Sequence, residues 1–334
     1  MEPNYEQLYQ MEQIKKNEKK VLKKSFALVA LTLIIYLVFS AVISLPLVFI
    51  NNILPSFILE NETLYSAIYY SLYLIITFLT GLVPAFFLRK MDKKPMGLYP
   101  VVDNIEPQKA LRYVCGGFMA SFVANLAANV FVSVFGSFGA ELTQPDFSLP
   151  ENPVGMFLYF IIITLGAGIG EEILFRGALL GCLRKYGDVS AIIISAFLFG
   201  AIHGNLIQMP FAFVLGLYLG YVAVKTRNLV YPMLVHAVNN GVATIVNYLS
   251  EGSGEIGAMI VGVFYTLVTI GLGVLGLVLL IIKRDDGYKL RKEQGVFTAG
   301  KKFSIMILTP LMIVLLVIVV ISMIPYIKLT GAIL

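Results

Sequence analysis

Long apolar runs constrain this chain more than any other feature of its sequence. Each run has about the ~20 residues that an α-helix needs to cross a hydrocarbon core of about 30 Å. Hydrophobic residues make up 58% of the chain and charged residues only 13%, about half the charged share of soluble domains. We therefore predict an all-α, polytopic membrane helical bundle with about 8–9 transmembrane helices. The apolar runs cover residues 25–50, 64–88, 110–137, 153–183, 191–209, 210–224, 228–249, 256–282 and 304–327.

The basic residues predict how these runs are oriented. If the N-terminus is cytoplasmic, all but two of the 25 lysines and arginines fall on inner segments, as the positive-inside rule requires. The outer segments 51–63, 138–152 and 250–255 then hold acidic residues and no basic ones. This distribution explains the net charge of +5 by topology, so we expect a lipid bilayer as partner and no nucleic acid. The inner segments are 1–24, 89–112, 184–188, 225–227 and 283–302.

The same patterns divide the chain into four parts. Residues 1–24 form a basic cytoplasmic segment, read as a flank that stops translocation or as a helix lying on anionic lipid. Residues 25–137 hold the N-terminal transmembrane helices, 153–250 the catalytic core and 256–334 the C-terminal transmembrane helices. In the last run, Pro310 and Pro325 could make the span shorter or re-entrant.

Two carboxylates and an arginine lie inside the run 153–183. A charge near the bilayer centre costs about 2.5–3.5 kcal/mol even on lenient scales, so such residues usually have a function. On a helix, Glu172 and Arg176 are four residues apart and share a face, where they can pair. Glu171 points about 100° away and has no partner in this stretch. We expect Glu172 and Arg176 to brace the helix, and Glu171 to be kept for chemistry.

Both histidines of the chain also lie in apolar runs. His236 and Asn240 share a helical face at a spacing of four. With a rise of ~1.5 Å per residue, Glu171, His203 and His236 lie about 20, 22 and 14 Å from the inner flank if they are helical. Each residue alone could serve helix packing, but their common depth favours one shared cavity.

A carboxylate, two imidazoles and an amide can form a hydrolytic site. Glu171 would act as general base on a water, with a histidine holding that water. A histidine beside the Asn240 amide would supply donors to an oxyanion. The glycines at 166, 168 and 170 would either pack closely against other helices or loosen the helix and let water approach.

At these residues the sequence resembles the CPBP family of intramembrane proteases, which includes CAAX proteases and bacteriocin-processing enzymes. Three family patterns occur in order on successive core helices, and the resemblance covers roughly residues 153–250. They read Glu171-Glu172-Ile-Leu-Phe-Arg176, Phe199-Gly-Ala-Ile-His203 and His236-Ala-Val-Asn-Asn240.

The resemblance implies an intramembrane endopeptidase of the bacterial cell membrane. Glu171 would activate water with His203, while His236 and Asn240 would form the oxyanion site. Glu172, Arg176 and Phe199 would support them. The substrates implied are prenylated CAAX proteins or leader-bearing peptides such as bacteriocins.

There is one alternative to the metal-free mechanism, and there are two alternatives to the enzymatic function. We expect no metal, because a zinc held by Glu171, His203 and His236 would occupy the best general base. That zinc set remains the alternative mechanism, although the helical His-Glu-x-x-His signature is absent. A non-catalytic bacteriocin immunity or scaffold protein, and a proton-coupled transporter that uses Glu171 and the histidines as a relay, are the alternative functions.

Overall fold

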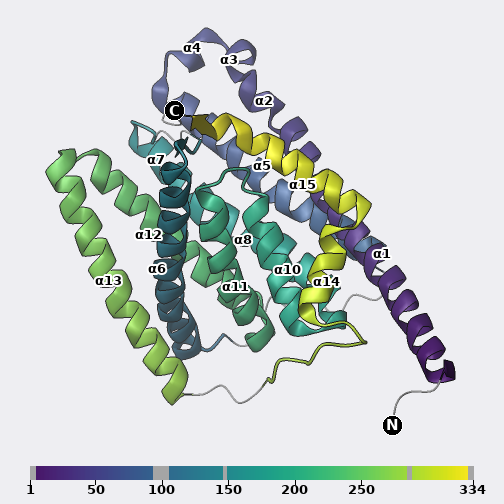
Figure 1. Ribbon diagram of the computed structural model, residues 1–334. Coiled ribbons are helices and arrows are strands. Elements are labelled where there is room, and N and C mark those ends of the chain that lie inside the picture. Colours follow the sequence, from purple (N-terminus) through teal and green to yellow (C-terminus); the bar gives the residue numbers. More distant parts are fainter. Residues whose placement is uncertain (1–4, 93–104, 146–148, 284–287, 330–334) are drawn as a thin grey trace.

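The computed structural model describes residues 5–92, 105–145, 149–283 and 288–329, and within these ranges the chain is a bundle of helices (Figure 1). This confirms the predicted all-α polytopic fold. Asp146, parts of the predicted inner segments 89–112 and 283–302, and residues 1–4 and 330–334 lie outside the described residues.

The elements follow in chain order. Six helices are long: α1 (Tyr5–Ile43), α5 (Glu62–Met91), α6 (Pro107–Ser137), α11 (Gln208–Thr226), α12 (Val230–Glu251) and α13 (Gly254–Ile282). The shorter helices are α2 (Leu45–Val48), α3 (Ile50–Ile53), α4 (Ser56–Leu59), α10 (Asp188–Ala201), α14 (Ala299–Ile307) and α15 (Pro310–Met323). The 3-10 turn η4 (Ile324–Tyr326) leads into β2 (Ile327–Leu329), which pairs antiparallel with β1 (Ala140–Leu142).

One further helical stretch, Pro153–Tyr186, changes its winding several times. Its parts are α7 (Pro153–Ile161), the π-helical η1 (Ile162–Ala167), α8 (Gly168–Glu172), the π-helical η2 (Ile173–Leu180), α9 (Gly181–Leu183) and the 3-10 turn η3 (Arg184–Tyr186). Wide π turns inside a helix are frequently found at functional sites, and here they lie on both sides of α8, which carries Glu171 and Glu172.

The described part of the chain contains fewer candidate spans than the predicted number of transmembrane helices. In the described part of the chain, six helices are long and apolar enough to cross a membrane, or seven if the bent pair α14–α15 is one span. The prediction of 8–9 is therefore not confirmed. Helix α10 has only 14 residues, and α12 is not among the six because polar residues such as His236, Asn239 and Asn240 interrupt its apolar sequence. The two helices that fall short are those that carry the histidine motifs.

The two ends of the chain also differ from the expected division. Helix α1 runs without a break from Tyr5 to Ile43, so the described part of the polar segment 1–24 continues directly into the first apolar run. At the other end, α14 and α15 are bent by 73° at a break just before Pro310. Proline cannot donate a backbone hydrogen bond to the preceding turn, which accounts for a break at that position.

Basic and acidic side chains tie the helix ends together at one end of the bundle. Asp188 accepts hydrogen bonds from Arg184 (2.8 Å), the Tyr288 hydroxyl (2.9 Å) and the Arg291 backbone N–H (2.9 Å). Burial tends to raise the pKa of Asp188, but these hydrogen bonds outweigh it and lower the pKa. The described stretch that contains Tyr288 and Arg291 thus contacts this end and fixes the start of α10. We call this group of four residues the Asp188 clamp.

Candidate active site

One cavity of about 320 Å³ collects the residues that the sequence singled out. Glu171, His203, His236 and Asn240 all line it, together with Phe199. They come from α8, the turn after α10, and α12, which are far apart in the sequence. The other lining residues are Tyr159, Ile163, Ala167, Gln208, Phe211, Ala212, Leu215, Ala243, Thr244 and Asn247.

Glycines let the carboxylate helix lie close to its neighbours. A Cβ on Gly81 of α5 would collide with the backbone of Gly170. A Cβ on Gly168 would lie 3.2 Å from the backbone nitrogen of Ala237 in α12, and one on Gly166 would lie 3.3 Å from the Thr77 side chain. Of the two roles expected for these glycines, the structure shows the close packing. The carboxylates are thereby held between α5 and α12.

The pair predicted from the spacing of four is present. Arg176 donates to Glu172 at 2.7 Å, and both side chains are fully buried. Arg176 also donates to the Gly216 carbonyl at 3.3 Å, and its guanidinium lies 4.3 Å from the centre of the Phe199 ring. A buried charge is tolerated when it is paired and hydrogen-bonded, so this cluster forms the floor beneath the cavity.

Glu172 has a second partner that the sequence did not reveal. His236 Nδ1 lies 2.9 Å from the same carboxylate oxygen, Glu172 Oε1. Because a carboxylate accepts, Nδ1 carries a hydrogen and Nε2 is directed to the other side of the ring. There it lies 3.9 Å from Glu171 Oε2. Glu172 therefore orients His236 as well as neutralising Arg176.

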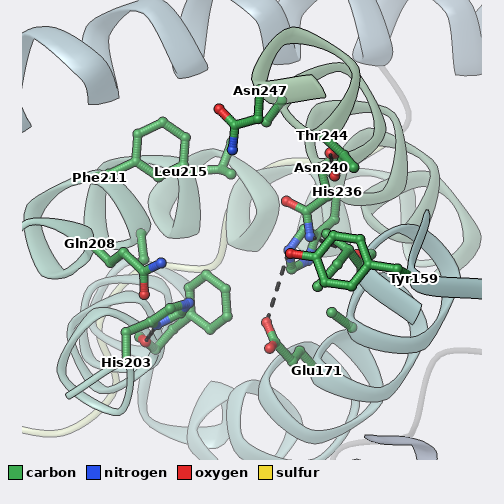
Figure 2. A pocket seen from close by; sticks show the side chains of 15 residues that line it. Tyr159, Glu171, His203, Gln208, Phe211, Leu215, His236, Asn240, Thr244 and Asn247 are labelled. Carbon is green, nitrogen blue, oxygen red and sulfur yellow. Dashed lines mark hydrogen bonds and ion pairs between the residues drawn. The ribbon is translucent and has the colours of Figure 1, made fainter. Parts of the chain in front are cut away.

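The two neighbouring carboxylates differ sharply in exposure. The Glu171 side chain is 26% exposed, whereas that of Glu172 is 0% exposed. Among the described residues that line the cavity, Glu171 is the sole carboxylate. Figure 2 shows it directed into the cavity towards His236, with His203 and Gln208 across from it. The exposed carboxylate is the one placed to meet a water or a substrate.

His203 lies in a turn rather than on a helix, which corrects the helical placement assumed for it. Helix α10 ends at Ala201, and Gly204 has a φ of +67°, a left-handed conformation that commonly ends helices. His203 Nδ1 donates to the Phe199 carbonyl at 2.7 Å, and the two rings meet edge-on at 4.9 Å. Asn205 then starts α11 by accepting from the Gln208 backbone N–H at 2.8 Å.

Asn240 is held so that one of its amide hydrogens has no partner among the described residues. Its Nδ2 donates to the Ile163 carbonyl of η1 at 3.1 Å, and its Oδ1 accepts from Asn239 at 3.3 Å. An amide nitrogen has two hydrogens, so a second one remains for a ligand. Asn239 is itself held by packing between helices, because it also accepts from the Ser121 hydroxyl of α6 at 2.5 Å.

Four polar lining residues were not predicted as site residues: Tyr159, Gln208, Thr244 and Asn247. Thr244 and Asn247 lie four and seven positions after Asn240, on the same helical face, so this spacing could have identified them. Tyr159 and Gln208 come from other elements and carry no such signal. Their position depends on how α7 and α11 pack around α12.

The hydrogen bonds of the two histidines are typical of metal ligands, but the positions of the side chains in the cavity are not. Both imidazoles have Nδ1 hydrogen-bonded to an acceptor, as metal-binding histidines usually do. However, within the described residues no three histidine, cysteine or acidic side chains are arranged to hold an ion. The set Glu171, His203 and His236 does not fit a zinc ion as it stands, and the metal-free expectation stays a prediction.

These features define an integral membrane protein with a polar, hydrolase-like cavity inside its helical bundle. Residues 153–242 match the family model described as "Type II CAAX prenyl endopeptidase Rce1-like", a range that contains every predicted site residue. The chain is also 26% identical over 257 residues to the Bacillus subtilis (strain 168) protein named "Putative membrane peptidase YdiL". The alignment covers 73% of this chain and 100% of that protein. No solved structure matches the chain. Both matches support the resemblance to the CPBP family that the three motifs indicated.

Proposed function

We propose that this protein is an intramembrane endopeptidase that hydrolyses peptide bonds of membrane-associated proteins or leader-bearing peptides. The observation that carries the proposal is the single cavity that holds Glu171, His203, His236 and Asn240. Structural hydrogen bonds between helices would not require a partly exposed carboxylate facing two imidazoles. Hydrolysis does require one, since a water must be deprotonated as it attacks.

The attacking water is assigned to Glu171 with His236 beside it. Glu171 Oε2 and His236 Nε2 are 3.9 Å apart, too far for a direct hydrogen bond. A water at a normal distance of about 2.8 Å from each fits between them on the cavity side. Glu171 takes the proton as the water attacks, and His236, held by Glu172, keeps the water oriented. The resemblance had implied His203 for this place.

The developing oxyanion is assigned to Asn240. The free amide hydrogen of Asn240 is held in position by two hydrogen bonds, and a fixed donor of this kind stabilises the tetrahedral intermediate. His203 lies across the cavity from Glu171 (Figure 2), where it would face a bound peptide. Phe199 holds this arrangement together, because its ring contacts Arg176, His203 and His236.

The substrate classes remain those implied by the family: a prenylated CAAX protein or a leader-bearing peptide. We further propose that the protein resides in a bacterial cell membrane with its N-terminus in the cytoplasm. The test is incubation of the purified protein in liposomes with both kinds of peptide, followed by mass spectrometry. In water labelled with heavy oxygen, hydrolysis places the label in the new carboxyl group. Peptides that stay intact with wild-type protein would oppose the proposal and favour an immunity or scaffold function.

The metal-free mechanism has its own test. The purified, active protein is analysed for metals, then dialysed against a strong chelator and assayed again. We expect cleavage to persist, because Glu171 serves as base without a metal. Near-stoichiometric zinc, with activity lost on removal and restored on addition, would instead make Glu171, His203 and His236 ligands.

A further inference from the structure

A second cavity of about 430 Å³ lies beside the active-site cavity. The two share Thr244. The walls of the second cavity come from the start of α7 and the end of α12, at the opposite end of these helices from the Asp188 clamp. The lining residues that bear on the argument are Met156, Phe157, Thr244, Ile245 and Tyr248.

The two cavities follow successive turns of the same two elements. On α12, Asn240 lines the first cavity, Thr244 lines both and Tyr248 lines the second. On the facing stretch, Tyr159 lines the first cavity and Met156 the second. The two cavities thus lie one after the other along the same two helical stretches, and we call this succession, starting at Asn240, the path.

The chemistry of the path changes along its length. Near Asn240 it carries carboxylate, imidazole and amide groups, whereas the second cavity is lined mainly by aliphatic and aromatic side chains. Its size is within the range of about 300–1,000 Å³ that ligand pockets occupy. A site of this kind takes a large apolar group.

We propose that the second cavity is a substrate subsite that binds a large apolar side chain of the peptide near the bond to be cleaved. This rests on the proposed function. Thr244 and Tyr248 lie one and two turns beyond Asn240, about 6 and 12 Å along the helix. An extended peptide advances about 3.3 Å per residue, so the bound side chain belongs to a residue about two to four positions from the scissile bond.

The test measures binding rather than cleavage, so that it does not depend on catalysis. Fluorescently labelled peptides that differ only by leucine or alanine at one scanned position are titrated onto Glu171→Gln protein. Burial of the additional carbon atoms predicts about tenfold tighter binding of the leucine peptide at the subsite position. In the wild-type protein, the same leucine should lower KM for cleavage.

Two residues of α12 provide a matched pair of variants. Ile245 and Leu249 are each 49% exposed, but only Ile245 lines the second cavity. Ile245→Trp should fill the cavity and remove the leucine preference, while Leu249→Trp should keep it. Phe157→Trp, on the opposite wall and 63% exposed, repeats the test if Ile245→Trp fails to fold.

The outcomes distinguish failure of the subsite proposal from failure of the proposed enzymatic function. A leucine preference that survives in both Ile245→Trp and Phe157→Trp overturns the proposal, even if the wild type cleaves peptides. The same holds if filling the cavity displaces only a phospholipid acyl chain and leaves peptide binding unchanged. Loss of the preference in Ile245→Trp but not in Leu249→Trp supports it, whether or not cleavage is detected.

Discussion

Glu171 and Glu172 are chemically identical neighbours whose surroundings give them different tasks. Glu172 is fully buried between Arg176 and His236, while Glu171 is partly exposed in the cavity. The spacing of four predicted the pair of Glu172 with Arg176 correctly, because helix geometry alone brings these residues together. The contact of Glu172 with His236 joins residues 64 positions apart. Only the packing of α12 against α8 produces it, so the sequence could not reveal it.

At the level of single residues, Asn240→Ala tests the oxyanion assignment. Removing one oxyanion donor commonly lowers turnover by about 10²–10³. We therefore expect kcat to fall by that factor while KM changes little, because the amide acts on the transition state. The measurement is steady-state cleavage of a peptide substrate in liposomes.

Asn239→Ala is not a suitable control for Asn240→Ala. Asn239 supports Asn240 and bonds to Ser121, so Asn239→Ala is expected to disturb both stability and turnover. Ser121→Ala removes the contact to α6 without touching Asn240 and should leave kcat within a few-fold of wild type. Equal losses of kcat in Ser121→Ala and Asn240→Ala would assign these residues to helix packing.

At the level of elements, hydropathy predicted the long helices well and the short helix α10, which precedes His203, less well. Apolar composition identifies α5, α6 and α13, which are long and apolar enough to cross a membrane. Its run 228–249 matches α12 closely, whereas its run 191–209 extends past the end of α10 at Ala201. The π turns on either side of α8 leave no signal in composition, since they arise from packing against neighbouring helices.

Gly81→Ala tests the close contact between α5 and α8. The added methyl group would collide with the Gly170 backbone, and overpacking of this kind costs about 1–3 kcal/mol. We expect a lower unfolding temperature in detergent and reduced cleavage, because the carboxylates move with α8. Gly271→Ala in α13, where a Cβ meets nothing within 4 Å, is the matched control and should unfold as the wild type does. Indistinguishable unfolding of the two variants would contradict the packing described.

The Asp188 clamp predicts a dependence of stability on pH. The folded-state pKa of Asp188 is lowered relative to the value of about 3.9 expected in the unfolded chain. Its ionised form therefore stabilises the fold above that pH, and the stabilisation is lost as the pH falls through the folded-state pKa. We expect the unfolding temperature to drop more steeply with acidification in the wild type than in Asp188→Asn. Parallel curves for the two proteins would show that the clamp contributes nothing.

At the level of the whole molecule, the basic residues of distant segments meet at one end of the bundle. Lys185 pairs with Asp92 at 2.9 Å, Lys225 donates to the Tyr288 carbonyl at 2.8 Å, and Lys302 pairs with Glu293 at 2.6 Å. The charge pattern thus anticipated which helix ends lie together. It could not show how they interlock, because that depends on individual side-chain partners.

The orientation of this end is tested by cysteine labelling. Ser253 directly precedes α13, and Lys292 follows Arg291 of the Asp188 clamp. Both residues are exposed, and both native cysteines are buried. With a cytoplasmic basic end, a membrane-impermeant maleimide should label Ser253→Cys in intact cells. It should label Lys292→Cys only after the membrane is opened. The reverse pattern would invert the topology.

The account depends most on the division of labour between the two adjacent carboxylates. Peptide cleavage and unfolding are therefore measured together for Glu171→Gln and Glu172→Gln in liposomes. Glu171→Gln should fold as the wild type does and cleave nothing, because an amide cannot accept the proton of water. Glu172→Gln should lose about 3–5 kcal/mol of stability, because Arg176 stays buried without its counter-charge. Cleavage by Glu171→Gln at the wild-type rate would contradict the central claim that this carboxylate activates the water.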